Sequence, residues 1–185
     1  SNMSRENETS TQRQPVELTQ EVHYGIEQQI GSKRPEEGGM LGGNRQRRLV
    51  TAFHYDKNAA RSGATYSPDC NSLNVLLDDW NSHNVSLMGF VHSHPDGIFY
   101  PSGGDLDYAE RILKHNPRMH EMLMPIVQPS RRGGKHRDRP FDMKMFVVTL
   151  NSRHVDVTEC EWRVTQESSV LATIPAEVTL EKAGH

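Results

Sequence analysis

The sequence contains few cysteines, few aromatic residues and no long hydrophobic run. Two cysteines, Cys70 and Cys160, cannot form a disulfide framework or a Cys-x-x-Cys zinc site. No stretch approaches the roughly 18 apolar residues that a membrane-spanning helix needs. Residues 1–15 also lack the apolar segment of a secretory signal peptide. We therefore expect a cytoplasmic protein with reduced thiols and no membrane partner.

Neither sign of charge dominates the chain. The 21 basic and 24 acidic residues give a net charge of −3, which does not favour general binding to nucleic acid or to a membrane surface. The segment 130–140 is locally basic. We interpret it as a solvated loop, with contact to an acidic partner or an insert that grips the substrate as the alternatives.

The composition predicts one folded domain with additional segments. Hydrophobic residues make up 34% of the chain, below the roughly 45–50% of typical globular proteins, so part of the chain should lie outside the core. Residues 1–17 are interpreted as a disordered leader, in which Ser1 and Asn2 ahead of Met3 resemble an expression remnant. The domain is expected over residues 18–165, and no pattern assigns a structure to the tail 166–185.

Hydrophobic periodicity predicts helices and strands that intermix along the chain. Helices are expected over residues 19–31, 69–81 and 103–115, and strands over 36–43, 48–54, 86–92, 122–127, 143–150 and 155–165. Because the elements do not follow a regular βαβ repeat, the expected class is α+β with a mixed sheet in a single domain.

Histidine is abundant, with ten residues, and two of them define a candidate metal site. His92 and His94 end an apolar strand, and residues two apart on a strand point to the same face. Asp105 follows in the first turn of the helix 103–115, and the loop 95–101 is long enough to bring that turn back to the strand end. Two imidazoles and one carboxylate with an open fourth position are typical of catalytic zinc. The alternative is a pair of strand-end histidines without a function.

The complete pattern is more specific than the histidine pair. His92, His94 and Pro95 are followed by Ser102 and Asp105, and this spacing resembles the JAMM motif of the MPN+/JAB metalloprotease family. The resemblance implies a curved mixed β-sheet flanked by helices, in the compact form of the prokaryotic JAB branch.

An upstream glutamate completes the resemblance. The segment from Glu36 to Gly43 reads EEGGMLGG and is similar to the family pattern E-x-x-G-x-L-x-G, with Glu36 rather than Glu37 at the glutamate position. The resemblance implies one zinc ion per chain, held by His92, His94 and Asp105, with zinc-bound water as the nucleophile. It further implies that Glu36 is the general base and acid and that Ser102 donates to the oxyanion.

The resemblance also implies a substrate class. Family members cleave after the C-terminal Gly-Gly of ubiquitin-like or sulfur-carrier proteins, either as isopeptidases or in precursor processing. Activating-enzyme-like and conjugating-enzyme-like proteins are the further partners that it implies. A non-catalytic scaffold is the alternative, but a structural zinc site would need neither Glu36 nor Ser102.

Three aromatic residues are candidates for the substrate cleft. Phe99 and Tyr100 lie in the loop beside the expected metal site, where they could line the cleft or pack the loop against the core. Tyr66, in the segment 55–67, could contact the substrate or only fill its loop.

Overall fold

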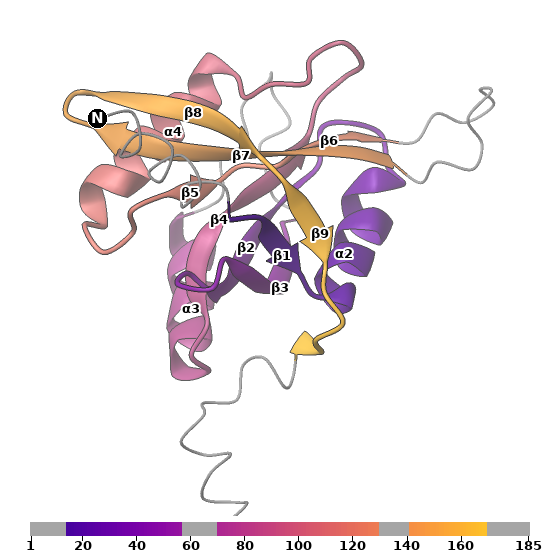
Figure 1. The fold of residues 1–185 in the computed structure, drawn as a ribbon, viewed down its shortest axis with the longest axis horizontal. Coiled ribbons are helices and arrows are strands. Elements are labelled where there is room, and N and C mark those ends of the chain that lie inside the picture. The colour runs from indigo at the N-terminus through magenta and orange to yellow at the C-terminus, as the bar shows by residue number, and fades with distance from the viewer. Residues whose placement is uncertain (1–13, 57–69, 130–140, 170–185) are drawn as a thin grey trace, which may run out of the picture.

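The computed structural model describes residues 14–56, 70–129 and 141–169 (Figure 1). The helical segments are α2 (Gln20–Ile26), its π-helical continuation η1 (Glu27–Gly31), α3 (Cys70–Ser82) and α4 (Gly103–His115). The strands are β1 (Val16–Leu18), β2 (Gly38–Asn44), β3 (Leu49–Tyr55), β4 (Ser86–Ser93), β5 (Met122–Leu123), β6 (Ile126–Pro129), β7 (Phe141–Asn151), β8 (His154–Cys160) and β9 (Trp162–Val164). The predicted α+β class and single mixed sheet are confirmed.

The strands form one nine-stranded sheet in the order β5-β7-β6-β4-β2-β3-β1-β9, with β8 paired to β7. At its centre, β2 runs antiparallel to both β3 and β4. Parallel pairs join β4 to β6 and β1 to β3 and β9. The central strand β4 therefore has its carboxyl end fixed between β2 and β6, and this is the end that carries the two histidines.

Helices cover the two faces of the sheet, as alternation along the central strands requires. Met40 and Phe90 belong to a core cluster that includes side chains of α3 and α4. Leu41 and Val91, the next residues in sequence, belong to a second cluster with side chains of α2. Figure 1 shows α2 well separated from α3 and α4. Alternate residues of β2 and β4 therefore pack against α3 and α4 on one face of the sheet and against α2 on the other.

The structure differs from the sequence-based expectations at three places. The strand β1 begins at Val16, two residues before the expected start of the domain, and Val16 is fully buried. The strand expected over 122–127 is split into β5 and β6, because Pro125 has no N–H with which to continue the ladder. The last expected strand is likewise split, into β8 and β9, with Glu161 between them.

Other expected elements are confirmed within a residue or two. Thr19 caps α2 by accepting a hydrogen bond from the Val22 N–H, and α4 has the predicted bounds. Ser169, at the end of the described tail, lies in hydrogen-bond distance of the Thr19 hydroxyl. Tyr66 and the basic segment 130–140 lie outside the described residues.

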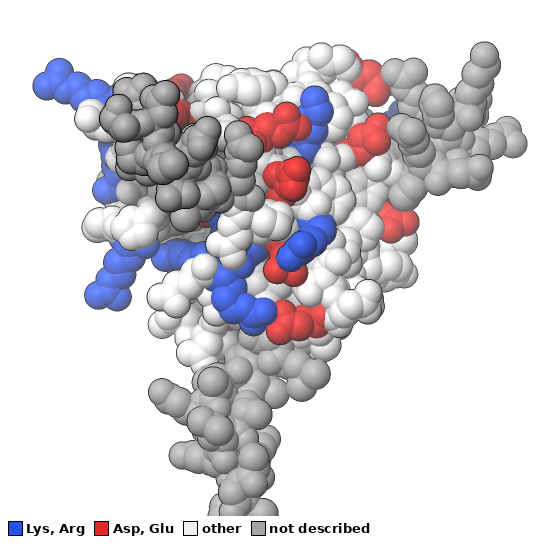
Figure 2. Space-filling view, viewed as in Figure 1, with Lys and Arg blue, Asp and Glu red and all other residues white. Residues whose placement is uncertain are grey.

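Two properties of the described residues bear on the environment of the protein. None of their helices is long and apolar enough to cross a membrane. On the face in Figure 2, acidic and basic side chains are interspersed, in agreement with the balanced composition.

Candidate metal centre

The side chains of two histidines at the carboxyl end of β4 point towards the helix α4. His92 and His94 are in phase with Phe90, whose side chain packs in the cluster that contains Ala109 and Leu113 of α4. Opposite His92, on β2, stands Gly38, which has no side chain to compete for the space. Strand alternation and this glycine therefore direct both imidazoles towards the first turn of α4.

The first turn of α4 supplies the carboxylate. Ser102 is the N-cap, and its hydroxyl accepts a hydrogen bond from the Asp105 N–H over 3.2 Å. In return, Asp105 Oδ2 accepts one from the Ser102 N–H over 2.8 Å, which completes a capping box. Ser102 and Asp105 thus hold each other in position through these two hydrogen bonds, which require no ligand.

The three candidate ligands converge in the interior. Asp105 Oδ2 lies 2.9 Å from His92 Nε2 and 3.4 Å from His94 Nε2. The three residues are between 1% and 3% exposed. In a tetrahedral zinc site with bonds of about 2.0–2.1 Å, neighbouring ligand atoms are about 3.3 Å apart, so both distances are close to what zinc requires.

The hydrogen bonding of the cluster also fits a metal ion. Both ring nitrogens of His94 are buried and have no hydrogen-bond partner among the described residues. Such groups are rare in proteins and call for an explanation such as an ion. Burial alone would raise the pKa of the Asp105 carboxyl, but its contacts with His92 and His94 and the hydrogen bond from Ser102 outweigh burial and hold the pKa well below its usual range. A buried anion beside two imidazoles is a suitable donor set for a divalent cation.

Sequence comparison agrees with this geometry. The family model of prokaryotic homologs of the JAB domain matches residues 22–164, a range that contains all three candidate ligands. The chain belongs to this family. Among solved structures, the JAB domain is similar to the solution structure of protein DSY2949 from Desulfitobacterium hafniense, with a TM-score of 0.60 and 20% sequence identity. The match covers 83% of this chain and 94% of the other, and at this identity it supports the fold alone. No curated protein matches the chain.

In the JAB domain, Glu36 lies two residues before β2. The pairing of β2 with β4 ends with Gly38 and His92, and continued alternation along the chain would put Glu36 on the face of the two histidines. Glu36 also lines a pocket of about 410 Å³ together with Pro95, the residue after His94. It does not belong to the group of candidate ligands. This position suits a group that acts on a substrate or on water rather than one that holds the metal.

The adjacent residue Glu37 belongs to the opposite face. The Tyr55 hydroxyl donates a hydrogen bond to the Glu37 carboxylate, and the Lys33 ammonium lies 4.4 Å from the centre of the Tyr55 ring. The Glu37 N–H donates to Ser93 Oγ, and the Ser93 N–H donates to the Glu37 carbonyl oxygen. The sequence analysis did not identify the contact between Ser93 and Glu37 or the role of Tyr55, because no local pattern relates segments so far apart.

The aromatic candidates have different surroundings. Phe99 is half-buried, packs against the cluster beneath α4 and lies under the Lys144 ammonium, 4.7 Å from its ring centre. Tyr100 is 51% exposed, and its ring contacts Phe146 edge-on at 5.3 Å between centroids. Tyr100 therefore has surface to offer a ligand, whereas Phe99 mainly fixes the loop.

Proposed function

We propose that this JAB domain is a zinc-dependent peptidase or isopeptidase that cleaves after the C-terminal Gly-Gly of a ubiquitin-like or sulfur-carrier protein. The observation that carries the proposal is the buried convergence of His92, His94 and Asp105, and Glu36 lines a pocket with Pro95, the residue after His94. Membership of the family supports it.

Each residue of the site has a role that its position allows. Zinc, held by His92, His94 and Asp105, would supply a Lewis acid and make water nucleophilic near neutral pH. Glu36 accepts a proton from the attacking water and passes it to the leaving amine, since one carboxylate can perform both transfers in turn. Ser102 donates a hydrogen bond to the developing oxyanion. A hydroxyl can accept and donate at once, so its role as the cap of α4 is compatible with this donation.

The pocket that Glu36 lines is suited to a substrate whose tail is narrow and extended. Its pocket is bordered by Pro35 and Pro95, whose rings are rigid. Glycine residues have no side chains to clash with such walls, so a Gly-Gly terminus can approach the metal closely. Beyond the pocket, Ile98 and Tyr100 are both about half exposed and offer apolar surface to the folded part of a substrate.

A cleavage assay with paired substrates tests the proposal. Purified protein of known zinc content is incubated with a ubiquitin-like protein joined after its Gly-Gly either to a lysine side chain or to a linear peptide. Cleavage of the lysine-linked substrate indicates deconjugation, and cleavage of the linear one indicates precursor processing. Bound zinc without cleavage of either substrate would instead favour a non-catalytic scaffold.

A further inference from the structure

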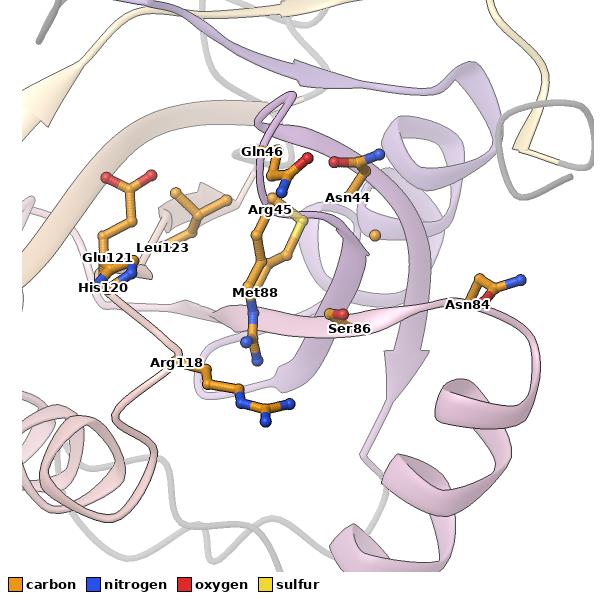
Figure 3. A pocket seen from close by; sticks show the side chains of 11 residues that line it. Asn44, Arg45, Gln46, Asn84, Ser86, Met88, Arg118, His120, Glu121 and Leu123 are labelled. Atoms are coloured by element: carbon orange, nitrogen blue, oxygen red, sulfur yellow. The ribbon is translucent and has the colours of Figure 1, made fainter. Parts of the chain in front are cut away.

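A second pocket lies at the other end of the central strands, away from the metal centre (Figure 3). Its volume is about 520 Å³, within the roughly 300–1,000 Å³ of small-molecule sites. Its walls come from the end of β2, the start of β4 and the segment that leads into β5. The metal centre lies at the start of β2 and the end of β4, so the length of the strands separates the two sites.

Two β-bulges adjoin this pocket. In β4, Leu41 pairs with Gly89 but Gly42 pairs with Leu87, which leaves Met88 as the extra residue. In β3, the same one-residue shift occurs opposite Gly42 and Gly43 and makes Thr51 the extra residue. Bulges bend strands and redirect their side chains, and they are frequent beside functional sites. Here they coincide on both sides of β2.

Arg45 is held in the pocket by one of these bulges. Its Nε donates a hydrogen bond of 2.7 Å to the Leu87 carbonyl oxygen, next to the bulged residue Met88. The guanidinium is half-buried, and burial lowers its pKa. Among the described residues no carboxylate pairs with Arg45. Glu121 is the acidic residue among those that line the pocket in the described part of the chain. Its carboxylate accepts hydrogen bonds from Arg48 Nε and Nη2 instead, at 2.8 and 2.6 Å.

A second guanidinium, of Arg118, shares the pocket. Its main chain is fixed in a turn between Asn116, which caps α4, and Met119, whose side chain is 3% exposed. Figure 3 shows the guanidinium groups of Arg45 and Arg118 directed to the same side of the pocket. No ion pair of Arg118 occurs within the described ranges. Two cations thus share one hollow in a chain whose net charge is −3.

We infer that this pocket binds a small organic phosphate, with the phosphoryl group between Arg45 and Arg118. Planar guanidinium forks match phosphate oxygens, and a doubly charged phosphoryl group can use two forks where a single carboxylate needs one. Met88 and Leu123, which are buried and line the pocket, offer apolar contact to the rest of the ligand. The inference rests on these residues alone and does not depend on the proposed peptidase activity.

Calorimetric titration of the full chain tests the inference with three probes: AMP, pyrophosphate and adenosine. We expect AMP to bind, pyrophosphate to bind more weakly, and adenosine not to bind. Arg45→Gln and Arg118→Gln should each weaken AMP binding by about tenfold or more, because each removes charge-assisted hydrogen bonds. Since Arg118 is exposed, its variant tests the inference even if Arg45→Gln fails to fold.

Two further variants serve as controls. Arg163→Gln removes the same charge from β9, at the opposite edge of the sheet, and should bind AMP like the wild type. Asp105→Asn should also bind AMP normally, because Asp105 does not line the pocket. AMP held by the metal centre would instead be affected by this change. The inference is overturned by absence of AMP binding up to about 5 mM, by unchanged affinity in Arg118→Gln, or by loss of binding in Asp105→Asn. Pyrophosphate that binds as tightly as AMP would also overturn the assignment of an organic ligand.

Discussion

Ser93 holds Glu37 through both its main chain and its side chain. The Ser93 N–H donates to the Glu37 carbonyl oxygen over 2.9 Å, and Ser93 Oγ accepts from the Glu37 N–H over 2.9 Å. A serine hydroxyl thus takes a position that a main-chain carbonyl would occupy in a regular antiparallel ladder. Ser93 lies between His92 and His94. The end of β4 therefore carries two candidate ligands and also holds the segment that contains Glu36.

Ser93→Ala should therefore reduce activity without removing zinc. The change leaves the Glu37 N–H without its acceptor in a part-buried place and should cost about 1–2 kcal/mol in the free energy of unfolding. We expect kcat to fall by about tenfold while KM and zinc content remain near wild-type values, because only the position of Glu36 is disturbed. Thr51→Val is the control, since the buried Thr51 hydroxyl has no partner among the described residues. A wild-type kcat in Ser93→Ala would reject this positioning role.

Glu36→Gln should retain zinc and lose cleavage. The amide cannot accept the proton of the attacking water, and loss of general-base catalysis lowers kcat by about 10²–10⁴-fold. Glu37→Gln, on the opposite face of the strand, should keep most of the activity. Zinc analysis and initial rates on the same preparations provide the measurement. If the two variants exchanged these phenotypes, Glu37 rather than Glu36 would be the base.

Asp105→Asn should lose zinc while preserving α4. Its side-chain oxygen can still accept the Ser102 N–H, so the cap is kept, but a neutral amide is a poorer zinc ligand than a carboxylate. We expect less than one tenth of the wild-type zinc content after dialysis, measured by elemental analysis (about tenfold weaker retention or more). Asp107→Asn, an exposed residue of the same helix, should keep its zinc. Equal zinc in the Asp105 and Asp107 variants would exclude Asp105 as a ligand.

Glu121→Gln should destabilise the fold more than removal of a surface ion pair. Arg48 contacts Glu121 through two nitrogens, and the two side chains are only 15% and 28% exposed. Hydrogen bonding to Glu121 raises the pKa of the Arg48 guanidinium above its ordinary value. We expect a loss of about 1–2 kcal/mol in urea unfolding. Glu167→Gln breaks the more exposed pair with Arg47 and should cost less than about 0.5 kcal/mol. Equal costs would show that burial adds nothing to the Arg48–Glu121 pair.

Gly89→Ala should prevent normal folding, whereas Gly103→Ala should not. A Cβ at Gly89 would lie 1.8 Å from the Leu123 carbonyl oxygen, so the backbones of β4 and β5 would have to separate. We expect a loss of about 3 kcal/mol or more, seen as a lower midpoint in urea or as insoluble protein. At Gly103, in the first turn of α4, the added group would meet no atom of the described residues within 4 Å beyond its own turn of helix, and alanine favours the helix. Similar stability in the two variants would contradict this packing.

Local patterns were enough to predict most elements of the fold. The apolar spacing in α3 and α4 gave bounds that agree with the structure to within a residue. The short strand β1 was missed, because Val16–Leu18 has too few residues to show a period and is defined by its pairing with β3 and β9. The strand expected over 122–127 is interrupted at Pro125, which separates β5 from β6.

The motif spacing predicted which residues form the candidate metal centre but not how they are held. His92, His94 and Asp105 were named from the sequence, and the structure brings them together in the interior. The clamp between Ser93 and Glu37 and the pocket of Arg45 and Arg118 had no signal in the sequence. Each joins segments that are separated by dozens of residues and share no periodicity.

The sequence by itself determined the fold class, the first turn of α4 and the three candidate ligands. These depend on short-range relationships: alternation along one strand, a cap three residues from its partner, and a fixed motif spacing. Only the tertiary structure decided the strand register that pairs Gly38 with His92, the burial of the cluster, and the two bulges that adjoin the distant pocket. The physical reason is that register and burial depend on contacts between distant segments, which close only when the whole sheet forms.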